Sequence, residues 1–157
     1  MIPGGPTSRR QQIGPFEAII RQGTDSSPTM VLFHGYGADG ADLAPISSEL
    51  PLREPIHALF PDGPLSLGLP GLSGGRAWFP IDEETIQKAQ LKGKHVDWTL
   101  FEPAGLAKTR ESAFKFLEAL RTPWSKLILG GFSQGAILAV DLALRSQHAP
   151  LALIALS

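Results

Sequence analysis

The chain has 157 residues, which is enough for one domain and too few for two domains of ordinary size. Its formal net charge of −1 provides no global field to attract nucleic acid or anionic lipid, and no apolar run reaches the roughly 18 residues of a membrane span. Hydrophobic residues make up 43%, which excludes a wholly disordered chain, and the absence of cysteine excludes a disulfide framework and a thiolate nucleophile. We expect one cytoplasmic domain with no nucleic-acid partner and no stable membrane insertion.

The first half of the chain predicts a leader followed by short strands. Residues 1–15 are rich in Gly, Pro, Arg and Gln, so we expect a loose leader there and the domain over 16–157. Short apolar strands are predicted at 16–20, 29–33 and 58–60, the second with the continuous apolar run of a strand buried on both faces. A helix is predicted over 41–50, with Asp39 as a plausible N-cap and Pro45 as an interruption.

The second half continues the alternation after a long glycine-rich loop over residues 65–80. Further helices are predicted at 81–91, from Pro103 onward and at 136–144, and further strands at 127–129 and 151–156. In the helix that Pro103 opens, one apolar face comprises Leu106, Ala113, Phe114, Leu117 and Leu120. Strands that alternate with helices predict an α/β fold, with a mostly parallel sheet and helices on both faces.

Residues 131–135 (GFSQG) have the G-x-S-x-G pattern of a nucleophile elbow. The sharp turn needs Gly131 and Gly135 because Cβ atoms there would collide, and Ser133 then sits at the tip beside a helix N-terminus, where backbone N–H groups favour negative charge. The pentapeptide alone is a weak signal, since Gly and Ser are common in loops. Its place between a predicted strand and a predicted apolar helix makes it a strong one, and it predicts Ser133 as a nucleophile.

Residues 34–37 (HGYG) directly follow the buried strand at 29–33. Acyl transfer to a serine needs two donors aimed at the oxyanion of the tetrahedral intermediate. One is the N–H after the nucleophile, here that of Gln134, and the other comes from the loop after an earlier strand, here most plausibly that of Tyr36. Alone, His34, Gly35 and Gly37 would indicate only a glycine turn; beside the elbow they favour an oxyanion loop.

Residues 31–40 (VLFHGYGADG) and 131–136 (GFSQGA) together resemble the phospholipase/carboxylesterase family of α/β-hydrolases, to which acyl-protein thioesterases also belong. The resemblance runs from about residue 16 to residue 157. It implies hydrolysis of carboxylic esters or thioesters with an apolar acyl group, through an acyl-enzyme on Ser133, with no metal and no cofactor. Residues 75–82 (GRAWFPID) are similar to the family's tryptophan-containing loop, which implies that Trp78 and Phe79 line the acyl pocket.

The sequence departs from this family in the triad. The family order is Ser, then Asp or Glu, then His, yet only 157 − 133 = 24 residues follow Ser133, and a helix and a strand occupy them. We therefore expect the catalytic acid and histidine, with the last strands and helices, to lie outside this chain. No convincing substitute is found among Asp141, His148, His57, His95 and His34, of which His34 is expected to orient the oxyanion loop instead.

Two hypotheses follow. The first is a serine esterase or thioesterase that needs a complementing C-terminal segment, in cis or from another chain; without the histidine, kcat should fall by about 10⁶. The second is a non-catalytic remnant of the fold that binds apolar ligands or a partner. In either case the apolar strand at 151–156 exposes an edge that invites pairing with another chain, so a homo-oligomer is also possible. Acyl chain length and ester or thioester preference are not fixed by any pattern.

Overall fold

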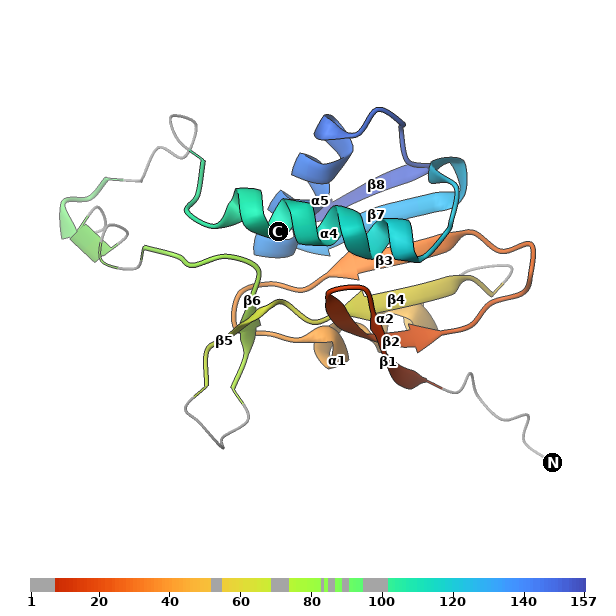
Figure 1. Cartoon of the computed structure of the whole chain (residues 1–157). Helices are drawn as coiled ribbons and strands as arrows, with labels where there is room; N and C mark the ends of the chain where they lie inside the picture. Colours follow the sequence, from red (N-terminus) through yellow and green to blue (C-terminus); the bar gives the residue numbers. More distant parts are fainter. Residues whose placement is uncertain are drawn as a thin grey trace.

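The computed structural model of the chain describes residues 8–51, 55–68, 74–82, 84, 87–88, 91–94 and 102–157. Six strands form one sheet in the order β1-β2-β4-β3-β7-β8 (Figure 1). Their bounds are β1 (Arg9–Ile13), β2 (Phe16–Arg21), β3 (Thr29–Phe33), β4 (His57–Pro61), β7 (Leu127–Phe132) and β8 (Ala152–Leu156). Strands β4, β3, β7 and β8 run parallel to one another, and β2 and β1 extend the sheet antiparallel at one side.

Helices cover both faces of this sheet, so the predicted fold class is confirmed (Figure 1). On one face lie α4 (Leu106–Ala119) and α5 (Gln134–Arg145), and on the other α1 (Gly40–Leu43) and α2 (Ile46–Glu49). Each layer encloses a hydrophobic cluster against the sheet. All five residues of β3 are buried, which agrees with the continuous apolar run predicted for a central strand.

The expected loose leader is wrong for residues 9–13, because they form strand β1. Every residue of β1 pairs with β2, from Arg9 opposite Ile20 to Ile13 opposite Phe16. Four of its five side chains are exposed, so the strand has no apolar alternation that a sequence pattern would reveal. Backbone pairing holds it, together with an ion pair of 2.6 Å between Arg10 Nη1 and the buried carboxylate of Asp62.

The helix predicted over 41–50 is instead two short helices, with Pro45 between them. Asp39 is the N-cap of the first, as predicted: its side chain accepts a hydrogen bond of 2.7 Å from the N–H of Ala41. The second helix begins after Pro45, where a continuous helix would need the N–H that proline lacks.

Helix α4 packs with a face slightly different from the predicted one. Phe116, which the prediction omitted, is fully buried, whereas Phe114 and Leu120 only line the edge of the core.

The 3-10 turn η2 (Trp124–Lys126) follows α4 and leads into β7.

The region predicted as a loop over 65–80 contains a small two-stranded sheet of β5 (Leu65–Ser66) and β6 (Arg76–Ala77). Of the helix predicted over 81–91, five of the eleven residues lie outside the described residues, and residues 84, 87, 88 and 91 are helical. Among the described helices, none has the length and apolar character required to cross a bilayer.

Candidate active site

Ser133 sits on the sharp turn predicted for it, between the last residue of β7 and the first residue of α5. Its backbone adopts φ 51° and ψ −114°, in the left-handed half of conformational space that a residue with a Cβ rarely occupies. Strain of this kind persists only where the surroundings enforce it, and it is concentrated at functional sites. The turn exposes Ser133 and places it at the N-terminus of a twelve-residue helix.

The two glycines of the elbow have a steric reason. A Cβ on Gly135 would lie 2.0 Å from the carbonyl oxygen of Phe33, and a Cβ on Gly131 would lie 2.3 Å from the carbonyl carbon of Gly135. Helix α5 can therefore approach β3 this closely only without those side-chain atoms. Gln134 is the first helical residue, and N–H groups of a first turn have no acceptor within their own helix.

The loop that contains His34, Gly35, Tyr36 and Gly37 lies next to this elbow. Strands β3 and β7 are parallel neighbours in register, with Phe33 opposite Gly131, so the segments that follow them meet at one edge of the sheet. Gly35 is buried beside Phe132, and Tyr36 is half-buried. The structure thus brings the two predicted oxyanion donors, Tyr36 and Gln134, to the edge on which Ser133 lies.

Strand β6 holds this loop in place through two backbone hydrogen bonds. The N–H of Gly37 donates to the carbonyl of Arg76, and the N–H of Arg76 donates to that of Ala38, both at 2.9 Å. Gly37 has φ 84°, a conformation that glycine adopts without strain.

His34 is fully buried, and both of its ring nitrogens are engaged. Nε2 accepts a hydrogen bond of 2.8 Å from the N–H of Gly63, so Nδ1 carries the proton and donates to the carbonyl of Gly35 at 2.7 Å. Burial lowers the pKa of His34, which keeps the ring neutral. A ring fixed in this way orients the loop and has no nitrogen left to act as a general base.

The side chain of Gln134 has a role that the sequence analysis missed. Its Oε1 accepts from the N–H of Trp78 at 2.9 Å, and its Nε2 donates to the carbonyl of Phe79 at 2.7 Å. The carboxamide therefore clamps the tryptophan loop to the start of α5. The only sequence signal was a polar residue at the head of a largely apolar helix.

Trp78 and Phe79, predicted to line an acyl pocket, are buried in the core instead. The Trp78 indole N–H donates to the carbonyl of His34 at 2.8 Å, and the ring packs edge-on against Phe33 and Phe16 at centroid distances of 5.0 and 5.4 Å. A buried indole needs an acceptor for its N–H, and the loop of residues 34–37 supplies one. The observed role of Trp78 is to brace that loop from below.

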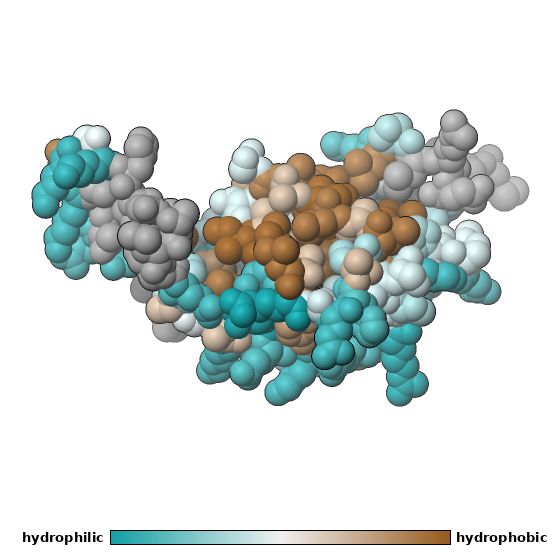
Figure 2. All heavy atoms as spheres, turned by 90° about the horizontal axis from the view of Figure 1, so that it is seen from above, coloured by the Kyte–Doolittle hydropathy of each residue, from teal (hydrophilic) through white to brown (hydrophobic). Residues whose placement is uncertain are grey.

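Trp78 and Phe79 are not among the residues that line the cavity beside Ser133. It measures about 660 Å³, and α5, β8 and the start of α4 line it with mostly apolar side chains. The lining residues are Leu106, Ser133, Ala136, Ile137, Val140, Asp141, Leu144, Ala155, Leu156 and Ser157. Seen from above, the molecule presents a continuous hydrophobic area on the side where α5 and β8 lie (Figure 2).

None of the other candidate triad partners on described residues reaches Ser133 in the structure. Asp141 on α5 is bound by Arg110 and by Arg145, the latter at 2.8 Å, and so joins α4 to α5 as an ion network. His57 opens β4 at the opposite edge of the sheet, where Nδ1 accepts from the N–H of Gly23 at 3.1 Å. His148 follows the far end of α5, and His95 lies outside the described residues.

The described part of the chain contains no cluster of three or more His, Cys, Asp or Glu side chains that could hold a metal ion.

Comparison with known proteins gives a family match and a set of similar folds. A family model described as phospholipase/carboxylesterase matches residues 15–157. No match was found among the curated proteins searched.

The similar solved structures include carboxylesterases from two bacteria. That of Bacillus cereus is 17% identical, with a TM-score of 0.64 and coverage of 90% of this chain and 59% of its own. That of Mesorhizobium loti is 21% identical, with a TM-score of 0.63 and coverage of 94% and 63%. Esterase PE8 is 25% identical, with a TM-score of 0.62 and coverage of 85% and 60%. The chain therefore spans about three fifths of the length of these proteins.

Proposed function

Because this chain belongs to the phospholipase/carboxylesterase family, we propose that it carries the nucleophile half of a serine hydrolase for carboxylic esters or thioesters with an apolar acyl group. The family and the similar structures support an esterase or hydrolase function. The cytoplasmic location expected from the composition is part of this proposal and has its own test in cell fractionation.

One observation carries the proposal: Ser133 is exposed at φ 51° on the turn between β7 and α5. An ordinary serine gains nothing from this backbone conformation, whereas a nucleophile gains an exposed Oγ beside the N-terminus of a helix. Across the register of β3 and β7, the loop of Tyr36 lies at the same edge of the sheet.

The proposed reaction uses these groups in order. The Ser133 Oγ attacks the acyl carbonyl carbon as its proton passes to a general base, and the N–H groups of Gln134 and Tyr36 stabilise the oxyanion that forms. The bond from carbon to the leaving oxygen or sulfur then breaks, and the leaving alcohol or thiol takes up the proton. Water, activated by the same base, hydrolyses the acyl-enzyme to the free acid and restores Ser133.

The base and its acidic partner are proposed to come from a further segment, in cis or from another chain. Two facts support this: the ring nitrogens of His34 are both occupied, and similar structures are longer than this chain. The cavity at Ser133 is where such a segment would dock, and Leu156 at the end of β8 and the following Ser157 border it.

A second candidate function rests on the same cavity. Its lining is largely apolar, so a remnant of the fold could bind an acyl chain or a partner without hydrolysing anything. This candidate predicts that Ser133 never reacts covalently, because no base activates it.

An activity-based probe separates these candidates in the source cells. We would label an extract with a biotinylated fluorophosphonate, isolate the adduct on Ser133 and measure the intact mass of the protein. A labelled species well above 16.8 kDa supports the hydrolase with a further segment in cis. A labelled species at 16.8 kDa contradicts the in-cis arrangement, and no label contradicts the nucleophile.

Matched variants expressed in the same cells make the result specific. Ser133→Ala removes Oγ, so labelling should disappear, and kcat of the enzyme complemented with the further segment should fall by about 10⁶. Ser125→Ala, an exposed serine in η2, should leave both unchanged. Equal labelling of the two variants would contradict the assignment of Ser133.

A further inference from the structure

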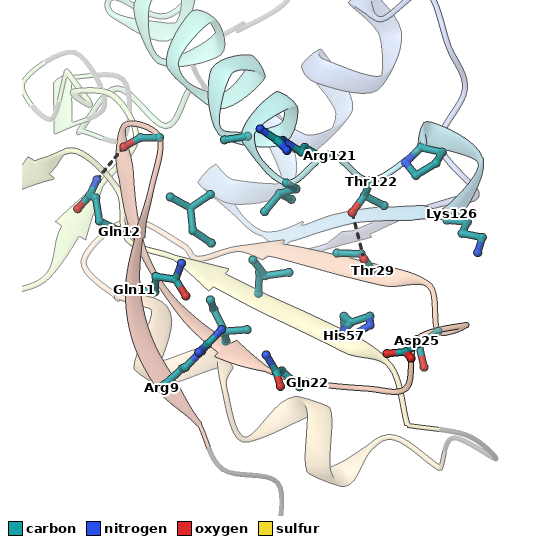
Figure 3. Close-up of a pocket in the computed structure, with 18 residues that line it drawn as sticks. Arg9, Gln11, Gln12, Gln22, Asp25, Thr29, His57, Arg121, Thr122 and Lys126 are labelled. Carbon is teal, nitrogen blue, oxygen red and sulfur yellow. Dashed lines mark hydrogen bonds between the residues drawn. The ribbon is translucent and has the colours of Figure 1, made fainter.

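A second cavity lies at the end of the sheet where the parallel strands begin, opposite the end that carries Ser133 (Figure 3). It measures about 630 Å³ and includes Thr29 and His57, the first residues of the parallel strands β3 and β4. Ser133 follows the last residue of β7, so the length of the parallel strands separates the two sites. The volume falls within the range of about 300–1,000 Å³ that is typical of small-ligand sites.

The charged groups around this cavity are mainly positive. Arg9 of β1, Arg121 after α4 and Lys126 before β7 line it on different sides, and Asp25 is the single carboxylate among the lining residues (Figure 3). Elsewhere in the described chain, arginines on β1, α4 and α5 pair with carboxylates. No ion pair of the described residues involves the three cations of this cavity.

Neutral groups of the lining can donate hydrogen bonds as well as accept them, and two buried apolar residues form its floor. The hydroxyls of Thr29 and Thr122 lie 3.4 Å apart, and His57 accepts at Nδ1, which leaves the proton of the neutral ring on Nε2. Beneath them lie the buried side chains of Ile20 and Leu59. Cations and donors suit an oxyanion, and the floor suits an apolar body attached to it.

The backbone of Arg121 carries the argument further. Two non-glycine residues of the described chain have positive φ, namely Ser133 at 51° and Arg121 at 55°. Arg121 follows the C-cap of α4, a position where glycine is favoured because it has no Cβ. Here the position holds a long cationic side chain instead, and it lines the cavity. Residues held in this region of conformational space are concentrated at functional sites.

We propose that this cavity is a binding site for a small organic anion, with its phosphate or carboxylate held by Arg121 and its apolar part on the floor. Arg9 and Lys126, on other sides of the cavity, add to its positive field. This inference does not depend on the proposed hydrolase, because Ser133 takes no part in it.

Calorimetric titration of the purified chain with phenyl phosphate, benzoate and phenol, at constant ionic strength, tests the site. Phenyl phosphate and benzoate should bind and neutral phenol should not, and the stronger of the two anions identifies the preferred oxyanion. Binding of phenol as tight as that of both anions would overturn the proposal.

Variants then assign the residues. Arg121→Gly should weaken binding of the preferred anion about tenfold while the melting temperature stays the same or rises, because glycine relieves the backbone strain. Lys126→Gln should also weaken binding, and Lys108→Gln, which removes an exposed charge of α4 outside the cavity, should not. Wild-type affinity in both Arg121→Gly and Lys126→Gln, or an equal loss in Lys108→Gln, would overturn the proposal.

Discussion

The two edge strands of the sheet differ in chemistry although both are exposed. Strand β1 (Arg9–Ile13) presents mainly charged and amide side chains, and Arg10 ties it to Asp62. Strand β8 (Ala152–Leu156) is wholly apolar, with Leu153 and Leu156 each 42% exposed. Charged side chains are a common protection of a sheet edge against pairing with another chain, whereas an apolar strand is typical of a sheet interior.

The side chains of β1 are therefore typical of a protected edge, whereas those of β8 are typical of a strand that pairs with a neighbour. Apolar side chains stand on both faces of β8, and the hydrophobic area seen in Figure 2 lies on the same side of the molecule. An apolar edge beside the cavity of Ser133 fits the proposed docking of a further segment there.

The largest difference in the free energy of unfolding should come from truncating paired leucines of β7 and β8 to alanine. Leu129 and Leu153 are opposite each other in register, but Leu129 is fully buried. Leu129→Ala should lower the free energy of unfolding by about 3 kcal/mol because it leaves a cavity, and Leu153→Ala by less than about 1 kcal/mol. Urea unfolding of both variants measures this, and equal losses would mean that β8 is already covered in solution, for example by a second copy.

A smaller effect should appear with pH at the centre of the sheet, where His34 follows β3. Burial lowers the pKa of His34. Below about pH 6.5, His34 is therefore protonated in the unfolded chain while it is still neutral in the folded chain. The free energy of unfolding should therefore fall as pH drops below that value, by up to about 1.4 kcal/mol per pH unit until the folded ring also titrates. Urea unfolding at several pH values should show a shallower slope for His34→Asn. An unchanged slope would contradict the buried neutral ring.

The smallest effect on the free energy of unfolding should be at the charged edge strand β1. Arg10→Gln removes the cation from Asp62, but the Arg10 side chain is 42% exposed, so solvent screening limits the loss to about 1 kcal/mol. Arg9→Gln, in the same strand and without such a pair, should change the free energy of unfolding by less than about 0.5 kcal/mol. Thermal unfolding of the two single variants compares them, and an Arg9 effect as large as that of Arg10 would show that the ion pair does not hold β1.

The sequence predicted most of the sheet and the position of the elbow, but it missed the side chains that support the site. Apolar runs revealed β3, β7 and β8, and the glycine spacing located Ser133. Polar β1 gave no periodic signal, and Trp78 was assigned to an acyl pocket by resemblance, although its indole N–H donates to the carbonyl of His34.

What the sequence alone determined about this protein is local: apolar runs define its interior strands, and glycines two residues on either side of Ser133 permit the sharp turn. Tertiary structure decided the pairing of β1, the neutral state of His34 and the clamp from Gln134 to Trp78, whose partners are 56 residues apart in the chain. The reason is physical. A turn or a strand pattern depends on neighbouring residues, whereas the hydrogen-bond partner and the burial of a side chain depend on segments that only folding brings together.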